Sequence, residues 1–392
     1  MNDSLFLHIV EKLEGFLGKL PATIQKPILH ELTPLKELFL QQRSPRFVFV
    51  GSSKLPLPEI LPALFGLVAE EPREAVTEIF RWVDLKMDAR GTISVLDARG
   101  ADDSAVANVR EELKLQAADI FFFVDDADAS RPPRKREIEN LAAFLQWNEE
   151  VAPGTKIIGV SLFDAARDRT KNGATADKQS TKLRAALEEE TSVRTHLTGI
   201  MPLPLRLGPS TENSNEAERL VALVTQNLPN QARVEMLRIS RDRAAQMEVA
   251  QVLVKSTTAI CTAIGAQPIP LADLPILTTL QLVMVSGIMY LSGRERSLRA
   301  ATEFMGALGA NVGAGMLLRE GTRALLKFFP GWGNVVCGMV AGAGTYAIGR
   351  AAIVYFIEGV SLKDARRTYL AGRKKSSRPR QDSSAFSPLN KL

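Results

Sequence analysis

Small and acidic residues follow three apolar runs of this chain, at points where a parallel sheet can bind phosphate or metal. Gly51 closes the first run, a D-A-R-G sequence at 97–100 follows the second, and Asp164 follows the third. The backbone N–H groups of a glycine turn can cradle a phosphate, and a carboxylate can hold Mg²⁺. These spacings therefore favour a phosphate-binding or nucleotide-binding chemistry, provided that the intervening loop supplies its donors.

The loop that follows Gly51 lacks the donors that this chemistry needs. The apolar run Arg46–Val50, the glycine turn and a helix closing at Ala63-Leu64-Phe65-Gly66 resemble the frame of an Era-type GTPase. In that family the phosphate loop reads G-x-x-x-x-G-K-[ST], and its lysine and hydroxyl contact phosphate and Mg²⁺. Pro56, Leu57 and Pro58 stand where the resemblance implies the second glycine, the lysine and the hydroxyl. Proline has no N–H and leucine has no charge, so we expect nucleotide binding to be weak or absent.

The D-A-R-G sequence resembles the D-x-x-G element of the same family. The resemblance implies that Asp97 positions Mg²⁺ and that the Gly100 N–H contacts a terminal phosphate. Thr77 lies where the family carries a switch threonine, so Thr77 and Asp97 are the candidate metal ligands. Aspartate and glycine also favour ordinary turns, which is the alternative interpretation.

Asp164 and Lys54 complete the set of candidate nucleotide contacts. Ser161-Leu162-Phe163-Asp164 matches the family pattern [NT]-K-x-D only at its final aspartate, which could equally cap a helix. Lys54 could reach a phosphate, or it could be a solvated loop residue. The candidate binding residues for GTP or GDP with Mg²⁺ are therefore Gly51, Lys54, Asp97, Gly100 and Asp164, and no catalytic residue is identified.

The order of apolar runs predicts a GTPase-like α/β domain with a mostly parallel sheet, followed by an all-helical domain. Strand patterns at 47–50, 92–96, 120–124, 156–160 and 201–205 alternate with helical ones such as 138–148 and 216–227. A long charged helix is predicted at 232–255. The expected domains are an N-terminal helical arm at 1–43, the α/β domain at 44–229, the helical domain at 230–362 and a basic disordered tail at 363–392.

The helical domain carries long stretches without charge. Residues 268–284 fit the pattern P-I-P-x-A-D-x-x-x-L-x-x-x-Q-x-x-M, and 342–349 end in T-Y-x-x-G. This region resembles an uncharacterised bacterial membrane-associated domain that often follows Era-like GTPase domains. Leu274–Gly293 is long enough to cross a bilayer, and Phe328–Gly349 is as long but rich in glycine. A tight soluble bundle of helices would give the same pattern, and both interpretations stay open here.

The basic charge of the chain belongs to its C-terminal tail. The formal net charge is +5, while residues 363–392 carry +7 and the remainder −2. Such a tail is either solvated and disordered or attracted to anionic lipid. It lacks the interleaved aromatic residues of a single-strand-binding surface, so nucleic acid is not an expected partner. The two cysteines and three histidines form no metal pattern.

These patterns predict a membrane-associated structural or regulatory protein with a GTPase-like domain that has lost its nucleotide chemistry. The alternative is an active GTPase in which Lys54, Ser52 or Ser53 serves the phosphate. Membrane lipid and a protein, for example an active GTPase, are the expected partners. The expected location is the cytoplasmic face of a membrane, the inner membrane in a bacterium.

Overall fold

A computed structural model divides the chain into two compact units. One is the continuous segment Glu37–Asp242, here called the α/β unit, and the other contains Arg243–Leu392 together with Met1–Lys36. The structure describes residues 25, 26, 29, 32, 41–54, 56–65, 79–87, 91–126, 135–164, 174–205, 215–240, 242–266, 273–309 and 332–376. The predicted N-terminal arm at 1–43 lies almost wholly outside these residues. Each unit is described by itself.

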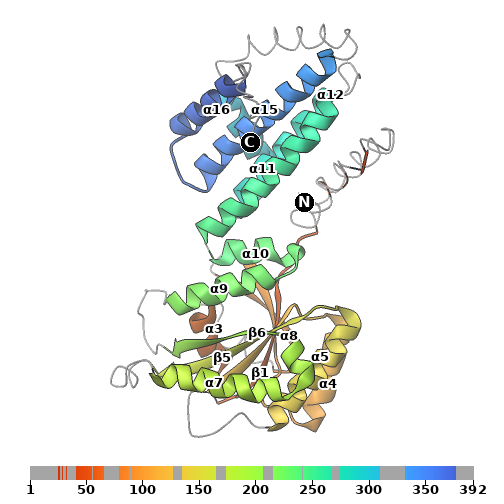
Figure 1. Cartoon of the computed structure of the whole chain (residues 1–392), viewed down its shortest axis with the longest axis vertical. Helices are drawn as coiled ribbons and strands as arrows, with labels where there is room; N and C mark the ends of the chain where they lie inside the picture. Colours follow the sequence, from red (N-terminus) through yellow and green to blue (C-terminus); the bar gives the residue numbers. More distant parts are fainter. Residues whose placement is uncertain are drawn as a thin grey trace, which may run out of the picture. The chain divides into compact units, whose positions relative to one another are not determined.

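The α/β unit is built on a mostly parallel sheet, as the sequence predicted, and the sheet has six strands rather than the five predicted (Figure 1). The strand order is β2-β3-β1-β4-β5-β6, and all pairs are parallel except β2 with β3. The strands are β1 (Arg46–Gly51), β2 (Trp82–Met87), β3 (Gly91–Asp97), β4 (Ile120–Asp126), β5 (Lys156–Asp164) and β6 (Leu197–Leu205). The antiparallel edge strand β2 was not predicted.

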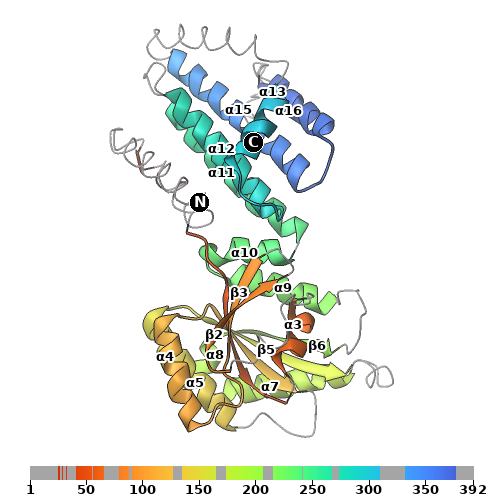
Figure 2. The ribbon, with the colours of Figure 1, turned by 180° about the vertical axis from the view of Figure 1, so that it is seen from behind.

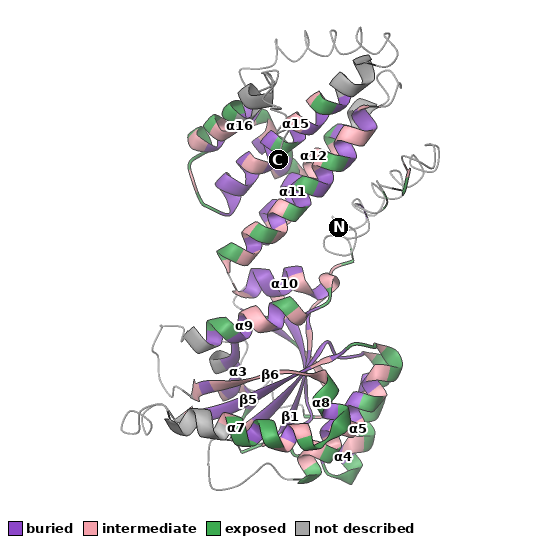
Figure 3. Ribbon diagram, in the orientation of Figure 1, coloured by how far each residue is buried: buried purple, intermediate pink, exposed green. Residues whose placement is uncertain are grey.

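Helices cover both faces of the sheet, and its central strands are buried on both sides (Figure 3). Side chains of α3 (Leu57–Phe65), α9 (Asn215–Asn227) and α10 (Asn230–Ser240) enclose one core. The opposite core is enclosed by α4 (Asp103–Leu115), α5 (Lys135–Val151), α7 (Ala174–Glu189) and α8 (Thr191–His196). The run of phenylalanines in β4 fits this arrangement, because a strand covered on both faces needs no polar side.

The predicted helix at 232–255 is two helices, which moves the end of the α/β unit. The helix α10 ends at Ser240, and α11 (Arg243–Gly265) begins the second unit. Ala232, Met236 and Ile239 of α10 lie in the core of the sheet. The α/β unit therefore extends to Asp242 rather than to 229, because the apolar face of α10 is buried on the sheet.

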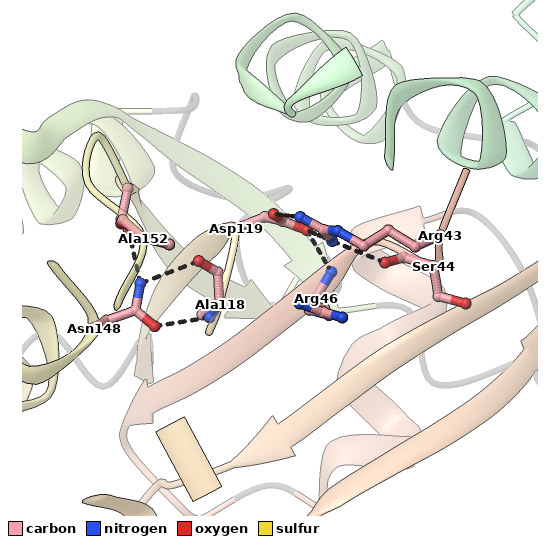
Figure 4. Close-up of polar contacts among 8 residues, drawn as sticks. Arg43, Ser44, Arg46, Ala118, Asp119, Asn148 and Ala152 are labelled. Carbon is pink, nitrogen blue, oxygen red and sulfur yellow. Dashed lines mark hydrogen bonds and ion pairs between the residues drawn. The ribbon is translucent and has the colours of Figure 1, made fainter. Parts of the chain in front are cut away.

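Polar side chains secure the amino ends of the strands (Figure 4). The Arg43 guanidinium donates to both carboxylate oxygens of Asp119 at 2.7 and 2.5 Å, and Asp119 also accepts from the Arg46 backbone N–H. The Asn148 amide is wholly buried and bonds both the N–H and the C=O of Ala118. Partial burial lowers the pKa of Arg46, and the neighbouring Arg43 charge lowers it further. These contacts fix where β1 and β4 begin.

The second unit is a bundle of helices. In the described residues it contains α11, α12 (Asp273–Leu291), α13 (Leu298–Gly309), α15 (Trp332–Phe356) and α16 (Leu362–Ser376). Figure 2 shows α13 and α16 beside α15. The Phe304 ring of α13 stacks on Tyr355 at 5.3 Å. The predicted disordered tail at 363–392 needs correction in its first part, because α16 packs on α15 and buries its Ala365 and Tyr369.

Glycines bring α11 and α15 into close contact. A Cβ atom added at Gly342 would lie 2.0 Å from the Thr262 hydroxyl, and one added at Gly349 would lie 2.5 Å from Val254. The small residues therefore let two helix backbones approach more closely than larger side chains would permit. The same contacts show that the two helices run antiparallel, because residue numbers rise along α15 as they fall along α11.

Candidate functional site

The candidate site lies where β1 and β3 end side by side. The helix α3 follows β1 on one face of the sheet, and α4 follows β3 on the other face. A parallel sheet commonly takes its ligand at such a place, where successive connections leave toward opposite faces. We call this place the switch point and define it by Gly51–Lys54 after β1 and Asp97–Ala101 after β3. Phe49 and Asp97 are partners in the parallel register, so the two segments start side by side.

Arg99 occupies the switch point. Its guanidinium binds both carboxylate oxygens of Asp97 at 2.8 Å and donates to the Ser52 carbonyl at 3.3 Å. The two charged side chains are 3% and 9% exposed, so the pair is almost removed from water. The carboxylate that the sequence assigned to Mg²⁺ is therefore neutralised by a cation of the same chain. These residues do not fit a bound Mg²⁺, because both oxygens of Asp97 already accept from Arg99.

The loop after β1 directs its first N–H group into the fold. The Ser52 N–H donates to the Val124 carbonyl of β4 at 2.8 Å. Gly51 has a φ of 106°, and a Cβ atom there would lie 2.3 Å from the same carbonyl oxygen. Only glycine permits this close contact. Gly51 is thus needed for backbone packing, and the neighbouring N–H group is not available to a phosphate.

The start of α3 is a poor anion site. A helix N-terminus attracts phosphate through unpaired N–H groups and the positive end of its dipole. Pro56 and Pro58 remove two of these donors, and Glu59 adds a carboxylate to the first turn of α3. The two prolines therefore weaken the start of α3 as an anion site, in addition to removing N–H donors from the loop.

The start of α4 is closed by its own aspartate. Asp102 accepts hydrogen bonds from the Ser104 and Ala105 N–H groups at 3.1 and 2.9 Å, as a helix N-cap does. The Ala105 N–H contributes most to lowering the pKa of Asp102, followed by the Ser104 hydroxyl. Gly100, whose φ is 69°, forms the preceding turn, and a Cβ atom there would meet the Ser53 hydroxyl at 2.8 Å. The turn after β3 therefore packs directly on the loop after β1.

The remaining predicted site residues are Lys54, Asp164 and Thr77. Lys54 is exposed in the loop. Asp164 ends β5, and two strands, β1 and β4, separate β5 from β3 in the sheet. Thr77 lies outside the described residues. The described part of the chain contains no cluster of three or more His, Cys, Asp or Glu side chains suited to a metal ion.

Arg99 was not predicted as a site residue, although it lies within the D-A-R-G motif at 97–100. The pattern D-x-x-G leaves that position free, so it gave no signal of its own. A basic residue two positions after the supposed metal ligand could have raised the question, because an aspartate and an arginine this close can pair.

The helical unit contains one described segment that is long and apolar enough to cross a membrane, Gly338–Phe356 of α15, and most of that segment is buried inside the bundle. Ile276–Leu291 of α12 is apolar but shorter. The core helix of a soluble bundle can be equally long and apolar. Length and composition alone therefore do not decide between a membrane-associated unit and a soluble bundle.

Comparison with known proteins gives a partial similarity. No family model matches the chain. A stretch is 30% identical over 132 residues to Magnetosome membrane protein 22 of Magnetospirillum gryphiswaldense. The match covers 31% of this chain and 66% of that protein, so this chain spans slightly less than two thirds of the relative's length.

Proposed function

We propose that the α/β unit is a GTPase-like module without a working nucleotide site, attached to a membrane-associated helical unit. The protein then acts as a structural or regulatory component, and its partners are membrane lipid and a protein such as an active GTPase. It resides on the cytoplasmic face of its membrane. Asp97, Gly100 and the loop at 51–54 serve in this proposal to hold the fold rather than a ligand.

The Arg99–Asp97 pair is the observation that carries this proposal. A guanidinium held by two parallel hydrogen bonds is a strong, geometrically specific partner for a carboxylate. For Mg²⁺ to bind Asp97, the arginine would have to leave a nearly dry position and give up its bond to Ser52. The loss of phosphate donors at Pro56, Leu57 and Pro58 leaves a nucleotide little to offset that cost.

Membrane association rests on different support. The helices α12 and α15 are apolar around most of their circumference, and the relative that matches part of the chain is named a membrane protein. A helix that is hydrophobic all round belongs either to a protein core or to a membrane. The proposal takes the second environment for part of this unit.

Calorimetric titration tests the nucleotide part. We expect the wild-type chain to give no measurable heat with GTP or GDP in millimolar Mg²⁺. The variant Arg99→Ala should behave in the same way, because the loop still lacks its donors. Arg136→Ala is the matched control, since Arg136 forms an exposed ion pair with Asp103 of α4. A micromolar dissociation constant for the wild type, with phosphate release, would favour the alternative of an active GTPase.

Flotation with lipid vesicles tests the membrane part. The purified full chain should rise with vesicles of phosphatidylcholine and phosphatidylglycerol mixed 3:1. Recovery of the chain entirely in the soluble fraction, at low and high salt, would contradict membrane association and leave the nucleotide conclusion untouched.

A further inference from the structure

Charge is distributed unevenly along the helices of the second unit. The charged residues of α11 all lie between Arg243 and Lys255, and the rest of that helix has none. Asp273 is the sole charged residue of α12, at its first position, and Arg350 that of α15. Between these positions lies an uncharged band, which we define as 256–265 of α11, 274–291 of α12 and 332–349 of α15.

Interhelical contacts place these three segments side by side. The antiparallel contact of α11 with α15 brings Val254 beside Gly349 and Ala266 beside Gly338. The Gln281 amide of α12 donates to the Thr345 hydroxyl of α15 at 2.9 Å. The uncharged segments therefore overlap in depth, and the band belongs to the bundle as a whole.

Arginines and aromatic rings gather at one boundary of the band, where α12 and α15 end. The Arg294 guanidinium lies 5.0 Å from the Phe356 ring centre and 5.6 Å from that of Tyr355. The Arg296 guanidinium lies 4.3 Å from the Tyr290 ring centre. We call these five residues the arginine–aromatic belt. Arginine with tyrosine is the combination that suits the polar headgroup layer of a bilayer, because each presents an apolar body and a polar tip.

The outward surface of α15 within the band is apolar. Met339 is 57% exposed and Tyr346 is 46% exposed, although residues 338–356 of the helix are otherwise mostly buried. The two residues are seven positions apart, so they lie on one face of the helix. Tyr346 is four residues before Arg350, about 6 Å along the axis, which is close to the belt's side of the band. Met339 lies farther from that boundary.

We propose that the helical unit enters a bilayer in one orientation, with the Met339 face of α15 in the hydrocarbon and the arginine–aromatic belt among anionic headgroups. This inference rests on the membrane part of the proposed function and adds the orientation and the contact residues. Segment 332–349 is about 27 Å long at 1.5 Å per residue, against about 30 Å for the hydrocarbon core. Arg319, Glu320, Arg323 and Lys327 precede α15 in the sequence and lie outside the described residues.

Single-cysteine labelling of the full chain tests the orientation. Cys261→Ala and Cys337→Ala remove the native thiols, and an environment-sensitive nitrobenzoxadiazole label is then attached at Met339→Cys or Glu358→Cys. Glu358 is exposed just beyond the belt. Leu115→Cys is the control, because Leu115 is an apolar residue of the α/β unit that is 81% exposed. The vesicles are the 3:1 phosphatidylcholine–phosphatidylglycerol mixture.

The expected result is a blue-shifted emission at position 339, protected from aqueous dithionite, with positions 358 and 115 quenched. If the chain floats with vesicles while position 339 is quenched, the orientation is overturned but membrane association stands. If the chain does not float, both are overturned.

Charge-removing variants test the belt separately. We expect Arg294→Gln and Arg296→Gln each to lower the partition coefficient onto anionic vesicles by about fivefold, the size of one basic contact near the surface. Arg294→Lys should restore most of the binding, which separates lost charge from lost packing. Arg184→Gln is the matched control, because Arg184 is half-exposed on α7 of the α/β unit. Unchanged partitioning of both glutamine variants would overturn the headgroup contact.

Discussion

Two arginine–aspartate pairs stand at opposite ends of the same sheet, and their geometry is nearly the same. Arg43 binds both oxygens of Asp119 where β4 begins, and Arg99 binds both oxygens of Asp97 where β3 ends. The Arg43 side chain is 26% exposed, whereas that of Arg99 is 3% exposed. One pair joins the start of the unit to its sheet. The other fills the place where a parallel sheet would hold a ligand, so equal geometry serves different purposes at the two ends.

Removing Arg99 should have the largest effect on stability. Arg99→Ala leaves the Asp97 carboxylate buried without its charged partner and with only the backbone N–H of residue 99 as a donor among the described residues, and loss of a buried partner typically costs about 3–5 kcal/mol. Urea unfolding in a Trp332→Phe background measures this, because Trp82 and Trp147 of the α/β unit are then the remaining tryptophans. The double variant Asp97→Ala/Arg99→Ala should recover part of the loss. A change below about 1 kcal/mol in the single variant would mean that water reaches Asp97 and that the switch point is open.

Removing Asp119 should have an intermediate effect. Asp119→Ala takes away the partner of Arg43 and the acceptor of the Arg46 N–H, and hydrogen bonds to a charged group contribute about 1.5–3 kcal/mol. The freed arginine can turn to water because it is already partly exposed. The same urea measurement should therefore give a loss of about 2 kcal/mol. A loss equal to that of Arg99→Ala would contradict the difference in burial between the pairs.

Removing Arg43 should cost less than removing its aspartate. Arg43→Ala leaves Asp119 with the Arg46 N–H, so the carboxylate keeps one donor. The Asp119 side chain is itself only 5% exposed, but Arg43 is 26% exposed, so its removal opens the carboxylate to water and we expect a loss of about 1 kcal/mol. Hydrogen exchange at the Arg46 amide should remain slow in this variant, whereas Asp119→Ala should speed it.

The smallest expected effect is a difference between the two pairs in how their contribution to stability depends on salt. Raising the ionic strength from 0.1 to 1 M shortens the screening length from about 10 to 3 Å, which weakens exposed pairs more than buried ones. The destabilisation caused by Arg43→Ala should therefore shrink in high salt, while that caused by Arg99→Ala should hardly change. Equal sensitivity of both variants would show that exposure does not distinguish the pairs.

Most of the sheet could be predicted from the sequence, because its central strands are recognisable as apolar runs. Phe121 and its neighbours form a continuous apolar run, and five predicted strands coincide with β1, β3, β4, β5 and β6. The edge strand β2 reads W-V-D-L-K-M, whose charged residues face outward and dilute the apolar signal. The break between α10 and α11 was also hidden, because both helices carry a helical period and no proline or glycine separates them.

The position of the candidate site could be inferred from the sequence, but the ion pair between Arg99 and Asp97 could not. The pattern around Gly51, Asp97 and Gly100 singled out the loops after β1 and β3, and these loops lie side by side in the structure. Sequence alone could not reveal that Arg99 turns back onto Asp97, because that contact depends on the turn at Gly100 and on the Ser52 carbonyl arriving from another strand. The nucleotide and metal assignments of these residues stay predictions.

The hydrogen bond from the Arg43 N–H to the Gln231 carbonyl, 3.0 Å long, has a consequence for how this protein could be rebuilt. This bond joins the segment by which the chain enters the α/β unit to the start of α10, the last helix of the unit. A segment with adjacent ends can be removed from a host or transplanted into another with little strain at the joints. Arg43 and Gln231 are two such adjacent points, so a chimera could exchange the chain between them for another α/β domain while keeping this hydrogen bond at the joint.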